Sequence, residues 1–264
     1  MVLDFLLSGY KNGLSYRTLG VMRSAVSSVA DIDGLPAGQH KLVCRFMKAV
    51  FNKRPAFPRY KSTWDPDLVL GHLRDLGSND SLSLIALSRK TVVLMLLLSA
   101  QRGQTLLALD IRDMELVPGK VSFGIGRLLK TSRPGHHLQE VSFSEYGPDE
   151  RLCVVRAVTE YLKRTADLRG NVTELFISSR SPYRQVSPDT LRRWTRDVLR
   201  GAGVDVSAFG PGSTRHAASS KVARICPIDV VMSAVGWTQC STFAVFYNKP
   251  IQPRAFSEAM MVNV

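Results

Sequence analysis

The feature that most constrains the fold of this chain is an unbroken apolar run, Val92–Leu98, inside a helix-like segment at residues 83–100. A helix that contains seven consecutive apolar residues has no polar face, so protein has to cover it on all sides. A membrane-spanning helix needs about 20 such residues, so this run is too short to cross a bilayer. The segment therefore predicts a buried central helix around which a globular domain packs.

Helical patterns surround this segment on both sides. From about residue 14 to residue 54, apolar residues recur at helical spacing behind Ser15, which suits an N-cap. Asp65-Pro66 and Ser187-Pro188 each combine a capping residue with proline at the first helical position. Further helices are expected at about 149–165, 188–201, 215–224, 228–235 and 240–247.

Strand-forming residues are concentrated in one part of the chain. Met114–Val117 and Val121–Leu129 are separated by the turn residues Pro118-Gly119, and a third strand is expected at Leu138–Phe143. Residues 130–135, between the last two strands, have the composition of a hairpin tip. The expected fold class is therefore mainly α with one small antiparallel β-sheet.

A segment at 54–61 with two prolines between basic residues is typical of an extended linker. We place a domain boundary there, with a helical domain at 1–60 and a larger domain at 61–264. The net charge of the chain is +13, and residues 1–60 hold nine Lys and Arg against three Asp. Such an excess favours a polyanionic partner, although a solvated basic surface would also account for it. The basic residues of the second helical stretch lie opposite its apolar stripe and are Lys41, Arg45, Lys48, Lys53 and Arg54.

The four cysteines are Cys44, Cys153, Cys226 and Cys240, and no two of them have the spacing of a zinc site. We expect them to be reduced, buried thiols in an intracellular protein. No cluster of acidic residues is typical of a magnesium site, so we expect no metal and no cofactor. The first residues show no charged segment followed by an apolar run, so we also expect no secretory signal.

Four separated stretches hold residues that could carry phosphoryl chemistry. Arg102 follows the central helix, Lys130 lies at the hairpin tip, Arg215 begins a late helix, and Trp237 and Tyr247 belong to the stretch 236–248. Each residue alone has an ordinary structural interpretation as a cap, a turn residue or core filler. In this order and spacing they resemble the tyrosine recombinases, also called the phage-integrase family, and within it the DIRS, Ngaro and Crypton recombinases of eukaryotic mobile elements.

The resemblance covers nearly the whole chain and implies a C-shaped clamp of two domains, a helical core-binding domain and a catalytic domain. It implies that Arg102 and Arg215 grip one DNA phosphate, which suits guanidinium groups because they donate bidentately and stay charged. Tyr247 would attack this phosphate and form a covalent 3′-phosphotyrosine without metal or ATP. Lys130 would protonate the leaving 5′-oxygen, and Trp237 stands where family members carry His or Trp.

Gly212 departs from the family pattern, which has histidine three residues before the second arginine. That histidine is assigned acid–base help, and the loss of such a group often lowers the rate by about 10²–10⁴-fold. The chain could be a slow recombinase, a catalytically impaired DNA-binding protein, or one that carries a deliberate inactivating change. We expect His216 to face a different side of its helix and to be a poor replacement, and His136 and His137 to be solvated loop residues.

The expected partner is double-stranded DNA, with a dimer on one site and a tetramer in the synapse, where a Holliday junction forms. A type IB topoisomerase, which shares the two arginines, the lysine and the tyrosine, is a further alternative. The apolar tail, with Phe256, Met260, Met261 and Val262, could dock on a neighbouring protomer or on its own domain. The protein would be nuclear in a eukaryote and otherwise cytoplasmic. The residues expected to contact DNA phosphates are Lys41, Arg45, Lys48, Arg59, Lys61, Arg133, Arg184, Arg192 and Arg193.

Overall fold

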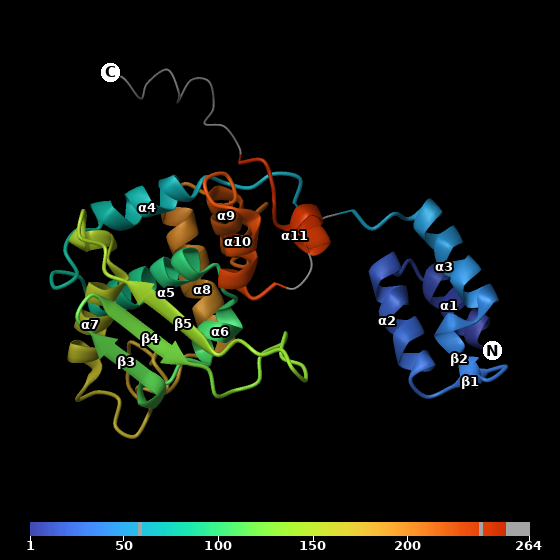
Figure 1. Ribbon diagram of the computed structural model, residues 1–264, viewed down its shortest axis with the longest axis horizontal. Helices are drawn as coiled ribbons and strands as arrows, with labels where there is room; N and C mark the ends of the chain where they lie inside the picture. The colour runs from blue at the N-terminus through green and yellow to red at the C-terminus, as the bar shows by residue number, and fades with distance from the viewer. Residues whose placement is uncertain (58–59, 238–239, 252–264) are drawn as a thin grey trace, which may run out of the picture. The chain divides into compact units, whose positions relative to one another are not determined.

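A computed structural model describes residues 1–57, 60–237 and 240–251 of the chain (Figure 1). Arg59 and the tail from residue 252 onward, which both entered the predictions above, lie outside these described residues. The chain divides into two compact units, Met1–Arg59 and Tyr60–Val264. Each unit has its own core, and each is described by itself below.

The smaller unit is built from α1 (Val2–Lys11), α2 (Tyr16–Ser27) and α3 (Lys41–Lys53). As predicted, Ser15 caps α2, because its Oγ accepts a hydrogen bond from the Thr18 amide at 3.2 Å. The helical pattern expected at residues 14–54 is found in α2 and α3, but it is not continuous between them. A hairpin of β1 (Asp31–Ile32) and β2 (Leu35–Pro36) interrupts it, followed by η1 (Ala37–Gln39).

The hairpin forms at the dipeptide Asp33-Gly34, whose φ angles are +52° and +76°. Two successive positive φ angles are the signature of the tight hairpin turn that Asp-Gly favours. The local turn preference therefore overrides the helical spacing of the apolar residues on either side.

Arg54 closes the smaller unit instead of joining its basic face, which corrects the prediction for this residue. Its guanidinium donates to the carbonyl oxygens of Tyr10 at 2.9 Å and Leu14 at 3.2 Å. It also lies 4.1 Å above the Tyr10 ring, within cation–π distance. The core beneath contains Leu19, Met47 and other apolar residues of the three helices.

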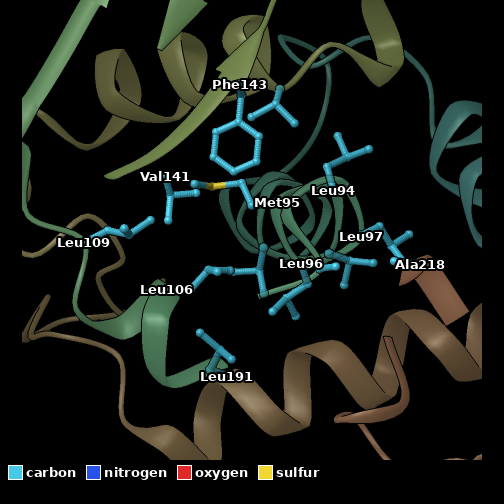
Figure 2. Packing of buried hydrophobic residues seen from close by; sticks show 14 of the residues in the cluster. Leu94, Met95, Leu96, Leu97, Leu106, Leu109, Val141, Phe143, Leu191 and Ala218 are labelled. Atoms are coloured by element: carbon cyan, nitrogen blue, oxygen red, sulfur yellow. The ribbon is translucent and has the colours of Figure 1, made fainter. Parts of the chain in front are cut away.

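The larger unit is organised around α5 (Leu84–Ser99), the buried central helix that the apolar run predicts. Ser83 caps it through a hydrogen bond from the Ala86 amide at 3.3 Å. The helix contacts α7 (Val154–Thr165), α8 (Pro188–Gly201), α9 (Ser213–Val222) and β5 (Glu140–Ser144). Figure 2 shows the close packing around it, with Phe143 and Val141 from the sheet beside Met95 and with Leu191 from α8 on another side.

The sheet of this unit has three antiparallel strands in the order β3 (Met114–Val117), β4 (Lys120–Gly124) and β5. The register pairs Met114 with Phe123 and Phe123 with Val141. The strand expected at Val121–Leu129 ends at Gly124, so a long connection at 125–139 carries the hairpin tip. The fold class, mainly α with a small antiparallel sheet, is confirmed.

The remaining elements complete the larger unit. Asp65 caps α4 as predicted, because its carboxylate accepts a hydrogen bond from the Asp67 amide at 3.0 Å. Among the described residues, no helix is long and apolar enough to cross a membrane. Besides α5, α7, α8, α9 and the three strands, the larger unit contains α4 (Pro66–Asp75), α6 (Gly103–Leu107), η2 (Ile111–Asp113), η3 (Glu150–Leu152), α10 (Ile228–Val235) and α11 (Cys240–Phe246).

The cysteines are free, but only Cys153 is fully buried. Cys44 and Cys240 are exposed and Cys226 is half-buried, so the prediction of buried thiols is wrong for these residues. Cys44 lies in α3 and Cys240 in α11, whereas Cys226 lies between α9 and α10, and apolar neighbours in the sequence do not decide which side of a helix faces the core.

Candidate active site

Arg102 is placed by the abrupt end of the central helix. Ala100 adopts a left-handed conformation with φ +49°, which ends α5 and redirects the chain into α6. Arg102 is then the N-cap residue of α6 and is half-buried. Gly103 allows close packing on α8, because a Cβ there would lie 2.9 Å from Leu191 Cδ2. The geometry of this junction therefore orients the Arg102 side chain.

Arg215 lies in the first turn of α9 and is 3% exposed. Its Nη2 donates to the Val235 carbonyl oxygen at 3.4 Å. Its Nε and Nη1 are buried and have no hydrogen-bond partner among the described residues. Burial, followed by the charge of Arg102, lowers the pKa of Arg215 to about 10, and Tyr247 opposes this shift. A guanidinium that is still charged and has unused buried donors is suited to bind an anion.

Tyr247 directly follows α11, and its hydroxyl lies 3.5 Å from Arg102 Nη2. Its ring lies 4.4 Å from the Trp237 ring and 5.5 Å from Arg215 Cζ. Arg215 Cζ is also 4.7 Å from the Trp237 ring, and the indole Nε1 has no partner among the described residues. The structure thus brings Arg102, Arg215, Trp237 and Tyr247 together.

The chain on both sides of Tyr247 is held in place. Ser220, which is fully buried in α9, donates to the Tyr247 carbonyl oxygen at 2.5 Å and accepts from the Lys249 amide at 2.9 Å. Further on, the Thr63 amide donates to the Pro250 carbonyl oxygen at 2.8 Å. Sequence patterns give no indication of the role of Ser220, because a serine in a late helix has many uses.

A cavity of about 560 Å³ opens beside these residues. Arg102, Arg215 and Tyr247 line it together with residues of α6, α8 and the loop before α9. Two cationic side chains, a phenol and an open volume therefore converge at one place. No group of three His, Cys, Asp or Glu side chains in the described ranges could hold a metal ion.

Lys130 is not part of this cluster. It is exposed at the hairpin tip, and its backbone amide donates to Gln104 Oε1 at 3.3 Å. Gln104 itself lines the cavity, so the tip is attached to the edge of the site. Gln104 lies two residues after Arg102, in the stretch that the sequence singles out, but it was not predicted as a site residue because nothing in the sequence indicates its contact with Lys130.

His137 braces the hairpin tip, so its predicted role as a solvated loop residue is wrong. Its ring nitrogens lie 2.7 Å from Ser132 Oγ and 2.7 Å from the Ile125 carbonyl oxygen. Ser132 Oγ in turn accepts from the Leu129 amide at 2.9 Å. His136 is half-buried, and its backbone pairs with that of Arg133.

Gly212 lines the cavity as the N-cap residue of α9 and has no side chain to contribute. His216 points to a different side of α9 from Arg215, as predicted, but this side also belongs to the site. His216 lines the same cavity and stacks on the Tyr247 ring at 4.6 Å with 21° between the planes. Residues 215 and 216 point to different sides of α9, but Tyr247 lies across both of them. The adjacency of Arg215 and His216 was the only sequence signal for this contact.

The residues predicted to contact DNA phosphates are on the surface wherever the structure describes them. Arg192 forms an ion pair with Asp189 at 2.7 Å on the exposed side of α8 and also lines the cavity. The predicted DNA-contacting residues that the structure describes, all of them exposed, are Lys41, Arg45, Lys48, Lys61, Arg133, Arg184, Arg192 and Arg193.

Comparison with known proteins identifies the family. The model of the phage integrase family matches residues 74–252, so the chain belongs to this family, that of the tyrosine recombinases. No curated protein matches the chain.

Solved structures share the fold at low sequence identity. XerH site-specific recombinase, in a pre-cleavage complex with its difH substrate, is 15% identical with a TM-score of 0.62 over 100% of this chain and 69% of that one. The Tn1549 transposon integrase, bound to transposon right end DNA, is 14% identical with a TM-score of 0.61 over 98% and 82%. A lambda integrase dimer bound to a COC′ core site is 14% identical with a TM-score of 0.52 over 96% and 80%.

Proposed function

We propose that this protein is a site-specific DNA recombinase or transposon integrase that cuts and rejoins DNA through a covalent 3′-phosphotyrosine at Tyr247. The observation that carries this proposal is the convergence of Arg102, Arg215, Trp237 and Tyr247 beside one cavity. Membership of the phage integrase family supports it.

The two arginines are the groups that would bind the phosphate to be cleaved. The unused Nε and Nη1 donors of Arg215 match the nonbridging oxygens of a phosphodiester, and Arg102 approaches from the side of the tyrosine hydroxyl. Charge that builds on these oxygens during the reaction would be stabilised by fixed cations. The indole N–H of Trp237, which also lacks a partner among the described residues, would donate to the same phosphate.

In the proposed reaction the Tyr247 oxygen forms a bond to phosphorus while the bond from phosphorus to the 5′-oxygen breaks. The phenol proton passes to solvent in the cavity as the oxygen attacks, because Gly212 offers no side chain to accept it, and the 5′-oxygen takes up a proton from Lys130. This last step requires the hairpin tip to approach the DNA, with Gln104 as its anchor on the protein side. The phosphotyrosine retains the energy of the broken bond, so religation to a 5′-hydroxyl needs no ATP.

DNA binding would use both units. The basic face of α3, with Lys41, Arg45 and Lys48, supplies phosphate contacts that set position and not sequence preference. Lambda integrase, whose fold this chain shares, has been solved as a tetramer bound to a Holliday junction. By analogy, we propose a dimer on one site and a tetramer in the synapse. We further assign the chain to recombinases of eukaryotic mobile elements, which implies a nuclear protein.

The test is the capture of the covalent intermediate. The full chain is first used to select bound duplexes from a random-sequence pool, and these are rebuilt with a nick that lets the cleaved fragment diffuse away. We expect a protein–DNA adduct that survives denaturation, and we expect none with Tyr247→Phe. If intact protein bound to the selected site gives no adduct, the proposed activity is wrong.

Gly212 favours a second candidate, a catalytically impaired DNA-binding protein of the same fold. The position offers only a backbone amide where the family has an acid–base side chain. Salt-sensitive binding to the selected duplex without any adduct would support this candidate over the first.

A further inference from the structure

Tyr247 lies in the middle of a continuous row of aromatic rings. The His216 ring stacks on it at 4.6 Å, and the Trp237 ring lies 4.4 Å from it with 36° between the planes. The row continues outward at both ends, because Tyr60 meets His216 at 5.1 Å and Phe243 meets Trp237 at 5.2 Å. The ring of the candidate nucleophile is thus in contact with both an imidazole and an indole.

The imidazole also contacts a second tyrosine, Tyr60. Tyr60 contacts His216 edge-on, with 75° between the planes, and packs on Phe209 at 5.5 Å. The Gly210 amide donates to the Tyr60 hydroxyl at 3.4 Å. His216 is therefore supported by the loop that leads into α9.

We propose that His216 is a positioning residue that holds the Tyr247 ring by stacking, so that α9 orients the nucleophile as well as the phosphate. One helix then carries three separate functions. Arg215 supplies donors to the cavity, His216 holds the tyrosine ring, and Ser220 holds the tyrosine backbone. The catalytic consequence rests on the proposed function of Tyr247, whereas the ring contact itself does not.

The geometry favours stacking over proton transfer as the role of His216. With only 21° between the planes, the faces of the two rings meet. The imidazole nitrogens lie in the plane of their ring, so a face-to-face contact does not direct them at the phenol oxygen. The hydroxyl is instead approached by Arg102 Nη2 at 3.5 Å.

Such a hold matters because Tyr247 follows a helix of only seven residues, α11. A short helix gives little stability of its own, so ring and backbone contacts have to define where the hydroxyl lies. A displacement of about 1 Å in a reacting group can lower a rate by about 10²-fold. The loss of stacking is therefore expected to slow cleavage without removing any group that binds DNA.

The first test needs no activity and no DNA. 3-Fluorotyrosine at position 247 reports the rings around it through its ¹⁹F chemical shift, and the same label at the half-exposed Tyr146 is the control. We expect His216→Ala to move the signal of label 247 and His216→Phe, which keeps a flat ring, to move it much less. The proposal is overturned if the label 247 signal in His216→Ala coincides with that of the parent chain.

The second test compares rates of adduct formation on the nicked duplex with the dissociation constants for the same DNA. We expect His216→Ala to cleave about 10²-fold more slowly with an unchanged dissociation constant, and His216→Phe to recover the rate to within about tenfold. Equal rates for His216→Ala and the parent chain would refute the positioning role, as would a Phe variant as slow as the Ala variant. If the parent chain forms no adduct, the proposed function fails, while the ¹⁹F result still decides whether His216 holds the ring.

Discussion

Replacing Gly212 with histidine should raise the rate of DNA cleavage, because the cavity has room for the side chain that the family pattern contains. Gly212 has an ordinary φ of −70°, and an added Cβ would have no atom within 4 Å. The residue is exposed and lines the same cavity as Tyr247 and Arg215. The first atom of a side chain at this position therefore meets open space at the edge of the cavity.

The change should leave the free energy of unfolding almost the same. A poorer N-cap residue costs about 0.5–1 kcal/mol, whereas removing the freedom of glycine in the unfolded chain stabilises by about 0.4–1 kcal/mol. These two effects oppose each other and are of similar size. A large shift in Tm would therefore show that the substitution perturbs α9 in a way that the structure does not predict.

The effect on cleavage should be much larger than the effect on stability. A positioned acid–base group contributes about 10²–10⁴-fold, which corresponds to about 3–5 kcal/mol of activation free energy. We expect about 10²-fold, the lower end, because the surrounding residues have not been optimised for histidine. The assay is single-turnover adduct formation on the nicked duplex, with Gly212→Ala as the matched control for the backbone effect. Equal rates for the His and Ala variants, both folded and both bound to DNA, would refute this reasoning.

Three further predictions concern the phosphate site, the hairpin tip and the core. Arg215→Lys keeps the charge but loses the planar set of donors, so we expect cleavage to fall about 10²–10³-fold in the same assay, with DNA affinity changed far less. Gln104→Ala removes the hydrogen bond to the Lys130 backbone, so we expect slower cleavage of the normal phosphodiester. A substrate with a 5′-bridging phosphorothioate should restore the rate, because a thiolate leaves without needing a proton. A defect of equal size on the phosphodiester and the phosphorothioate would argue against a role of Gln104 in placing Lys130. Burial is the main cause that lowers the pKa of Lys90, on α5, from 10.5 to about 8, although its ammonium donates to the Gly77 carbonyl oxygen. Between pH 8 and pH 10.5 the unfolded chain therefore binds more protons than the folded one, so the free energy of unfolding should rise with pH. We expect a rise of up to about 3 kcal/mol in the parent chain relative to Lys90→Met, measured by urea unfolding at pH 7.5 and 10.

The sequence predicts the architecture well where one physical signal dominates. Residues Val92–Leu97 of the apolar run are buried, and α5 is the core of the larger unit, whereas Leu98 at the end of the run is 54% exposed and departs from the expectation. Ser15, Asp65 and Ser187 cap helices as expected, because a side-chain oxygen at this position satisfies an otherwise unpaired amide. Such signals are local, so they need no knowledge of the rest of the fold.

Features that depend on how distant segments meet could not be predicted in the same way. The contact between His216 and Tyr247 arises because the chain after α11 crosses two neighbouring positions of α9. The bracing of the hairpin tip by His137 requires the loop 125–137 to fold back on itself. In both cases helix or turn patterns show that a residue is near a motif but do not show which side chain it touches.

Some residues of the candidate site could be predicted from the sequence and others could not. The order of Arg102, Arg215, Trp237 and Tyr247 in the chain was sufficient to select four residues that lie together in the structure. Gln104 and Ser220 were missed because both act through backbone groups of other residues, Gln104 through the amide of Lys130 and Ser220 through the backbone on either side of Asn248. A hydrogen bond to a backbone amide or carbonyl places almost no demand on the sequence of its partner.

The most direct test of the central claim is mass spectrometry of the trapped adduct. The protein is incubated with the nicked duplex, the covalent complex is digested with protease and nuclease, and the site of the residual nucleotide is read from the fragments. We predict a nucleotide joined through its 3′-phosphate to Tyr247. A nucleotide on any other residue, or a 5′-phosphate linkage, would contradict the account.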